Sequence, residues 1–253
     1  MPTIDRDGVR IHWEATGDGP AVLLTHGYTA TSRMWEPNLA ALAADHRVVT
    51  WDIRGHGRSD SPTDAAAYSV DASVADMAAV LDAAGAERAV IAGMSLGGYL
   101  SLAFHLRHPD RTVALALVDT GPGFRKDEAR AAWNRTAEAY ATGFEERGLG
   151  ALAERAEVRR ADHRDPGDLA RAARGILAQR GPEVIDSLPS IAVPTVVIVG
   201  DRDEPFLAGS RYMASKIPDA TYVEIPDAGH ASNIDQPERF AAAMRGLLER
   251  CAA

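Results

Sequence analysis

Short runs of almost entirely apolar residues, separated by amphipathic stretches, constrain the fold of this chain most strongly. The runs lie at residues 21–25, 47–51, 89–92, 113–118, 195–199 and 221–225. Such runs are typical of parallel strands that are covered on both faces. Helical spacing of apolar residues follows in stretches 71–84, 96–108 and 237–250. Strands that alternate with helices predict an α/β fold, with a mostly parallel central sheet flanked by helices.

One segment interrupts the alternation of strands and helices. It contains no convincing strand, whereas Trp133, Tyr140 and Phe144 recur at helical spacing within it. Helices inserted into such a scaffold usually cover the carboxyl edge of the sheet, where binding sites lie. A packing appendage without ligand contact is the alternative. The predicted division is a core of residues 1–120 and 191–253 and an inserted helical cap of residues 121–190.

Composition excludes several classes of protein. The chain of 253 residues is 46% hydrophobic, which excludes disorder as its main state. A net charge of -9 argues against nucleic acid as a partner, because phosphates require a basic surface. No secretory signal and no stretch of about 20 apolar residues are visible, so we expect a cytoplasmic protein without membrane association. The single cysteine, Cys251, excludes an internal disulfide, and the oligomeric state is not readable.

The sequence Gly93-Met94-Ser95-Leu96-Gly97-Gly98 follows one apolar run directly and begins a helical stretch. The pattern G-x-S-x-G between a strand and a helix is the nucleophile elbow. Its tight turn requires an unusual backbone at the serine, so the flanking positions must lack a Cβ atom. The turn lifts the hydroxyl above the sheet edge. We therefore predict a nucleophile at Ser95, with a helix-capping serine as the alternative.

A reactive serine requires a base and a carboxylate that orients the base. His230 lies in a predicted loop after the last strand, at the same sheet edge as Ser95. Asp203 lies in the loop after run 195–199 and is the preferred carboxylate, whereas Asp201 is expected to stabilise the turn. Asp119, at the end of the preceding run, is the competing candidate. No H-E-x-x-H or similar spacing occurs, so no metal site is predicted.

Motifs along the whole chain resemble the α/β-hydrolase superfamily, in its small branch that carries a cap. They are Thr25-His26-Gly27-Tyr28, residues 51–59 (WDIRGHGRS), the elbow at 93–98, residues 200–203 (GDRD) and Gly229-His230. The order Ser, Asp, His is the order that this superfamily uses. The resemblance implies an α/β-hydrolase fold and an oxyanion hole formed by the backbone N–H groups of Tyr28 and Leu96. It also implies that His26 braces its loop.

By its cap and length, the chain resembles enol-lactonases, small carboxylesterases and carbon–carbon bond hydrolases. We expect a serine hydrolase, without cofactor, that cleaves an ester, lactone or related carbonyl bond of a small molecule through an acyl-enzyme on Ser95. Carbon–carbon bond hydrolysis and cofactor-free haloperoxidase or perhydrolase activity are alternatives, and a small-molecule receptor that keeps the triad is a third. Trp133, Tyr140 and Phe144 are candidate substrate-binding residues, although a seam between cap and core is the favoured interpretation.

Overall fold

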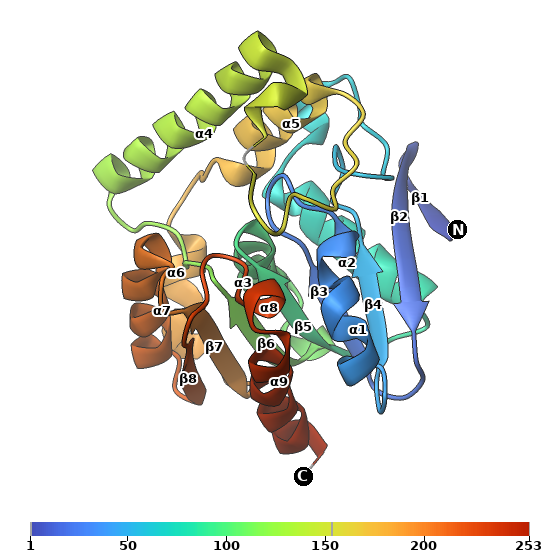
Figure 1. Cartoon of the computed structure of the whole chain (residues 1–253), viewed down its shortest axis with the longest axis vertical. Coiled ribbons are helices and arrows are strands. Elements are labelled where there is room, and N and C mark those ends of the chain that lie inside the picture. The colour runs from blue at the N-terminus through green and yellow to red at the C-terminus, as the bar shows by residue number, and fades with distance from the viewer. Residues whose placement is uncertain (1, 153, 253) are drawn as a thin grey trace.

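The computed structural model of this chain describes residues 2–152 and 154–252 (Figure 1). These residues form an eight-stranded sheet in the order β1-β2-β4-β3-β5-β6-β7-β8. Strands β1, β2 and β4 pair in antiparallel fashion, and every pair from β4 to β8 is parallel. The predicted α/β fold is confirmed. The strands are β1 (Thr3–Arg6), β2 (Val9–Thr16), β3 (Ala21–Thr25), β4 (Arg47–Trp51), β5 (Ala89–Met94), β6 (Thr112–Val118), β7 (Thr195–Gly200) and β8 (Ala220–Ile225).

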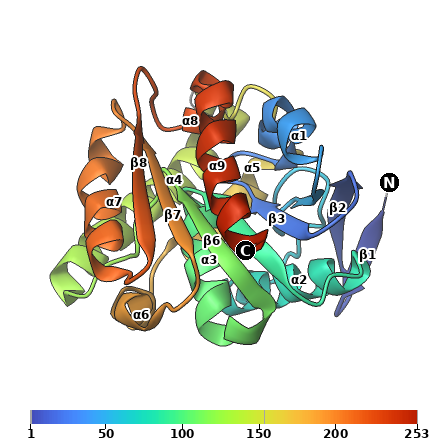
Figure 2. The ribbon, with the colours of Figure 1, turned by 90° about the horizontal axis from the view of Figure 1, so that it is seen from below.

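The central strands are apolar throughout because side chains on both faces of the sheet are buried. Leu23 and Ile91 point into the hydrophobic layer that contains α2 (Val70–Ala83) and α3 (Leu96–Arg107). Val22 and Val90, one residue earlier, point into the opposite layer. Figure 2 shows helices on both faces. The opposite layer is completed by α1 (Glu36–Leu42), α8 (Ser232–Asp235) and α9 (Pro237–Ala252), and the first also contains α7 (Glu204–Lys216).

The sequence patterns did not indicate β1 and β2. These strands lie at one end of the sheet and pair in antiparallel fashion. Their side chains are mostly half-buried or exposed, with Ile11 and His12 as the buried residues of β2. A strand that is covered incompletely carries polar residues, so it lacks the continuous apolar run that marks the parallel strands.

Between β6 and β7 the described residues form helices, turns and irregular stretches but no strand. The larger helices are α4 (Asp127–Arg147) and α5 (Pro166–Ala172), the latter continuing into a π-helical turn, η5 (Ala173–Leu177). Figure 1 shows α4 and α5 beyond the carboxyl ends of the parallel strands. The last helices, α6 (Glu183–Ser187) and η6 (Leu188–Ser190), instead pack against α3 and α7. The part of residues 121–190 that covers the sheet edge therefore ends before α6.

Short 3-10 helices complete the description of the fold. They are η1 (Ser32–Trp35), η2 (Ala65–Ala67), η3 (Pro109–Arg111) and η4 (Gly148–Ala151). Of the helices in residues 2–152 and 154–252, none has the length and apolar character that crossing a membrane would require.

Candidate active site

Ser95 occupies a sharp turn between β5 and α3. Its backbone has φ 54° and ψ −117°, a conformation that is costly for any residue with a side chain. The turn is possible only because its neighbours are glycines. A Cβ on Gly93 would lie 2.2 Å from the carbonyl oxygen of Gly97, and a Cβ on Gly97 would lie 2.2 Å from that of Thr25. Close backbone packing therefore fixes the position of the Ser95 hydroxyl.

Hydrogen bonds from the neighbouring strand β6 and its loop hold this turn. The Ser95 N–H donates to the carbonyl oxygen of Val118 at 2.9 Å. The Thr120 hydroxyl donates to the carbonyl oxygen of Ser95 at 2.6 Å. The strained conformation is thus supported from outside the turn itself, which is the general requirement for a strained residue to persist.

His230 lies at the same sheet edge and is oriented by Asp203. The distance from His230 Nδ1 to Asp203 Oδ2 is 2.8 Å, and the Asp203 side chain is buried. The imidazole also stacks on Phe206, with ring centroids 4.7 Å apart. Burial alone would lower the pKa of His230, but the hydrogen bond to Asp203 and the negative charges of Asp203, Asp119 and Glu157 together raise it above its ordinary value.

Asp119, the competing carboxylate, makes different contacts. Its oxygens accept hydrogen bonds from Gly200 N at 2.8 Å, from Ser232 N at 3.0 Å and from the Ser232 hydroxyl at 2.6 Å. Burial raises the pKa of Asp119 to about 7 in spite of these donors. The carboxylate joins the end of β7 to the segment that follows His230. The imidazole of His230 itself donates its hydrogen bond to Asp203.

Asp201 stabilises the turn beside Asp203, in the way that the sequence suggested. Its carboxylate accepts a hydrogen bond from Ala228 N at 3.2 Å, and Arg202 N donates to the carbonyl oxygen of Ala228 at 2.9 Å. These bonds tie the loop after β7 to the loop after β8. The relative positions of Asp203 and His230 therefore depend on backbone contacts between the two loops.

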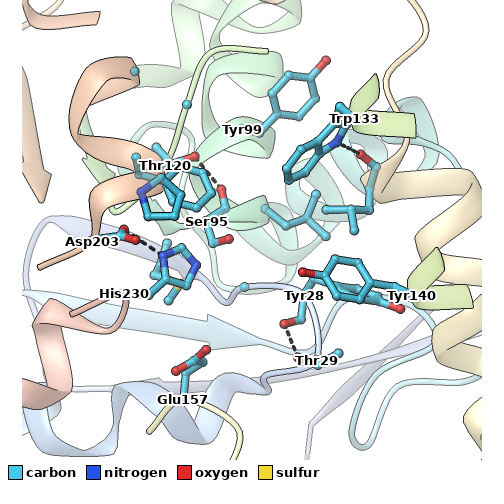
Figure 3. A pocket seen from close by; sticks show the side chains of 18 of the residues that line it. Tyr28, Thr29, Ser95, Tyr99, Thr120, Trp133, Tyr140, Glu157, Asp203 and His230 are labelled. Carbon is cyan, nitrogen blue, oxygen red and sulfur yellow. Dashed lines mark hydrogen bonds and ion pairs between the residues drawn. The ribbon is translucent and has the colours of Figure 1, made fainter. Parts of the chain in front are cut away.

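Ser95, Asp203 and His230 line one cavity of about 650 Å³ (Figure 3). In Figure 3 the Ser95 hydroxyl and the His230 ring face the same part of this cavity. No hydrogen bond joins the two groups in the described structure, an arrangement common in sites without substrate. Within residues 2–152 and 154–252, no three His, Cys, Asp or Glu side chains lie close enough together to hold a metal ion.

Two backbone N–H groups beside Ser95 are free to bind a ligand. Tyr28 and Leu96 both line the cavity, and neither N–H donates to an acceptor within the described residues. Leu96 is the first residue of α3, where a helix leaves its N–H groups without partners. Gly27 lets the loop approach the elbow, since a Cβ there would lie 2.9 Å from Met94 Sδ and 3.3 Å from Ser95 Cβ.

His26 holds the loop that carries Tyr28. Its Nε2 accepts a hydrogen bond from Ile53 N at 2.9 Å, so Nδ1 carries the proton and donates to the carbonyl oxygen of Gly27 at 2.7 Å. Burial lowers the pKa of His26 to about 4. A neutral, fully hydrogen-bonded imidazole is therefore part of the scaffold and faces away from the chemistry.

Comparison with known families agrees with this arrangement of strands, elbow and loops. Residues 22–243 match the sequence profile of the α/β hydrolase family. This chain belongs to the α/β hydrolase family. It is a hydrolase enzyme of that family, and the resemblance noted from the sequence motifs is confirmed.

Several relatives match nearly the full length of this α/β hydrolase. A 3-oxoadipate enol-lactonase from Acinetobacter baylyi is 28% identical, with 97% of this chain and 95% of the relative covered. A putative carbamate hydrolase RutD from Variovorax paradoxus is 31% identical, with 96% and 97% covered. Among solved structures, a thermophilic esterase from Thermogutta terrifontis is 30% identical, with a TM-score of 0.81 and 99% and 97% of the two chains covered.

Trp133, Tyr140 and Phe144 of this α/β hydrolase line the cavity, and Tyr140 and Phe144 also form a seam between insertion and core. Tyr140 and Phe144 pack on the Tyr28 ring, with centroids 5.9 and 6.3 Å away. Trp133 Nε1 donates to the carbonyl oxygen of Leu177 at 2.9 Å. The two interpretations of the sequence were therefore not exclusive, because the seam is one wall of the cavity.

Two residues that the insertion places at the cavity or beside it were not predicted from the sequence. Glu157, in the segment between η4 and α5, lines the cavity and is buried. His163, later in the same segment, contacts the carbonyl oxygen of Thr29 at 2.9 Å through Nε2. This segment is rich in charged residues and has no periodic apolar pattern, so it reads as a solvated loop. The burial of Glu157 and His163 depends on how this segment packs in the tertiary fold.

Proposed function

We propose that this α/β hydrolase is a serine hydrolase that cleaves an ester, lactone or related carbonyl bond of a small molecule. The observation that carries the proposal is the hydrogen bond that His230 Nδ1 donates to Asp203, in a cavity where Ser95 lies at a strained turn. Nucleophile, base and orienting carboxylate are the parts that acyl transfer requires. The unpaired N–H groups of Tyr28 and Leu96 supply the remaining part, an oxyanion hole.

In the proposed mechanism, His230 Nε2 takes the proton of the Ser95 hydroxyl while Ser95 Oγ attacks the carbonyl carbon. The carbonyl π electrons move to oxygen, and the Tyr28 and Leu96 N–H groups stabilise that oxyanion. Each such donor lowers the barrier by roughly 3 kcal/mol. The imidazolium then protonates the leaving oxygen as its bond to carbon breaks. Water attacks the resulting acyl-enzyme by the reverse sequence, which restores the Ser95 hydroxyl and releases the acid.

Asp203 contributes through the imidazole. Its hydrogen bond at Nδ1 places the proton on that nitrogen, which leaves Nε2 as the acceptor that faces the cavity. The raised pKa of His230 also makes the ring a stronger base at neutral pH. These two effects support the assignment of His230 as the general base.

The relatives and the cavity support a small substrate with an electrophilic carbonyl. Enol-lactonase, esterase and carbamate hydrolase are the names of three full-length relatives, and attack on a carbonyl is common to all three reactions. A cavity of about 650 Å³ lies in the range that accommodates small molecules. Trp133, Leu177 and Tyr99 provide much of its apolar wall.

The decisive experiment is reaction with a fluorophosphonate probe and with p-nitrophenyl acetate. The wild-type enzyme should be labelled on Ser95 and should release p-nitrophenol. Ser95→Ala should not be labelled and should lose about 10⁶ in kcat, because nucleophile and base act as one unit. Ser215→Ala, a substitution on the exposed side of α7, is the matched control and should retain both properties. Labelling of Ser95→Ala at the wild-type rate would place the nucleophile elsewhere.

A further inference from the structure

Glu157 is a buried carboxylate that the proposed mechanism does not use. Only 5% of the residue is exposed, and its carboxylate makes no hydrogen bond or ion pair with the described residues. Figure 3 shows this side chain pointing into the cavity beneath His230. A carboxylate that opens only into a cavity loses part of its hydration, so a cationic group of a ligand in that cavity would be stabilised by pairing with it.

The other charges at the cavity do not neutralise Glu157. Arg202 also lines the cavity, but its guanidinium is paired with Asp227 and is largely exposed. Arg155 lines the cavity as well, but it is exposed to solvent and makes no ion pair with Glu157 in the described structure. Asp203, the other carboxylate that lines the cavity among the described residues, is hydrogen-bonded to His230. Among the described residues that line the cavity, Glu157 is therefore the carboxylate that has no hydrogen-bond or ion-pair partner.

The two sides of the cavity differ in chemistry. The rings of Tyr99 and Trp133 form a largely apolar wall on the side remote from Glu157 (Figure 3). Glu157 lies on the side of His230, and its charge acts on the His230 ring. In acyl transfer the imidazolium delivers its proton to the leaving oxygen, so the leaving group must lie next to His230. The acyl chain then faces the apolar wall, and the alcohol portion faces Glu157.

We propose that Glu157 binds a positively charged ammonium group on the alcohol side of the scissile ester. This inference rests on the proposed function, which sets the orientation of the ester. The preferred substrate class is accordingly an ester of an amino alcohol with an apolar acyl chain. A carboxylate on the alcohol portion would be excluded, because like charges in a partly buried site repel strongly.

The test compares two esters of the same shape that differ by one charge: 2-(trimethylammonio)ethyl butanoate and 3,3-dimethylbutyl butanoate. For the wild-type enzyme, kcat/KM should be about tenfold higher for the cationic ester. In Glu157→Gln the ratio of the two values should fall to about one, chiefly through a higher KM for the cationic ester. Glu157→Asp, which keeps the charge, should retain a ratio above one.

Glu154→Gln is the matched control, because it removes one negative charge from an exposed position three residues earlier and should keep the wild-type ratio. A wild-type ratio of one or less would overturn the inference. So would an equal loss for both esters in Glu157→Gln, since that result would show Glu157 acting only through His230. In that case the pH profile of kcat/KM for the neutral ester should differ between the wild-type enzyme and Glu157→Gln.

Failure of the proposed function is distinguishable from failure of the inference. If Ser95 does not react with the fluorophosphonate, the proposed function fails. The ammonium site can then still be tested by calorimetry, which measures the binding of choline and of 3,3-dimethylbutan-1-ol to the protein. Tighter binding of choline to the wild-type protein than to Glu157→Gln would support the ammonium site. If Ser95 reacts and the neutral ester is hydrolysed without any charge preference, the inference alone fails.

Discussion

The core loops at the carboxyl edge of the sheet and the insertion above them are held by different kinds of contact. In the core, backbones approach so closely that glycine is required, as where a Cβ on Gly200 would lie 2.3 Å from the carbonyl oxygen of Gly229. The insertion is fastened largely through side chains, such as the Tyr28 hydroxyl that donates to the carbonyl oxygen of Leu169 at 2.8 Å. Its one close backbone approach of this kind among the described glycines is at Gly175, where a Cβ would lie 2.2 Å from the carbonyl oxygen of Tyr68. Backbone packing thus positions Ser95, Asp203 and His230, whereas side-chain contacts hold most of the insertion.

The largest expected effect tests whether residues of the core loops alone determine the rate of catalysis. Asp203→Asn should lower kcat about 10⁴-fold, because an amide at Nδ1 favours the wrong tautomer of His230. Asp119→Asn should instead lower the free energy of unfolding by about 2 kcal/mol, since buried donors lose a charged acceptor, with a far smaller effect on turnover. Steady-state kinetics and urea denaturation separate the two effects. The opposite ranking in kcat would make Asp119 the orienting carboxylate.

The next effect compares glycines of the two regions. Gly97→Ala places a Cβ 2.2 Å from the Thr25 carbonyl oxygen, so it should cost about 3 kcal/mol of unfolding free energy or prevent folding. Gly150→Ala, in η4 of the insertion, meets no atom within 4 Å and should change stability by less than about 0.5 kcal/mol. Urea denaturation of both variants measures the difference. Similar values for the two would refute the distinction between the regions.

This contrast also explains how much the sequence could reveal. The central strands, the elbow and the positions of Asp203 and His230 follow local rules, because apolar runs, glycine spacing and strand ends leave direct marks in the sequence. The exposed strand β2 and helix α7 lack such marks and were not predicted. Glu157 was also not predicted, since its burial arises from the way the insertion crosses the core.

Acid should lower the stability of the folded protein through its buried histidines. Burial lowers the pKa values of His26, His56 and His163, so the folded protein favours their neutral forms. These neutral histidines contribute fully to the free energy of unfolding above pH ~6.5, where the same side chains are also neutral in the unfolded chain. The contribution is lost as the pH falls toward their pKa values in the folded protein. For His26, with a pKa of about 4, the loss by pH 4 is about 3 kcal/mol. Urea denaturation between pH 7.5 and 4 measures it, and a flat dependence would contradict the prediction.

The smallest effect tests a side-chain contact of the insertion. Trp133→Phe removes the hydrogen bond to the Leu177 carbonyl oxygen, which should cost about 1 kcal/mol of stability and raise KM a few-fold with little change in kcat. Trp13→Phe is the matched control, because Trp13 Nε1 is buried without a partner and lies outside the cavity. Thermal unfolding and kinetics with p-nitrophenyl butanoate give the readout. A fall in kcat as large as that of Asp203→Asn would contradict the division between regions.

The dipeptide Tyr28-Thr29 belongs to both regions at once. Its backbone supplies a proposed oxyanion donor, while the Tyr28 hydroxyl and the Thr29 carbonyl oxygen are held by Leu169 and His163 of the insertion. Lifting the insertion to admit a molecule would break both attachments and release the segment that carries this donor. Access to the cavity and alignment of the donor are thus mechanically linked, so an open enzyme is also one whose oxyanion hole has lost its outer support.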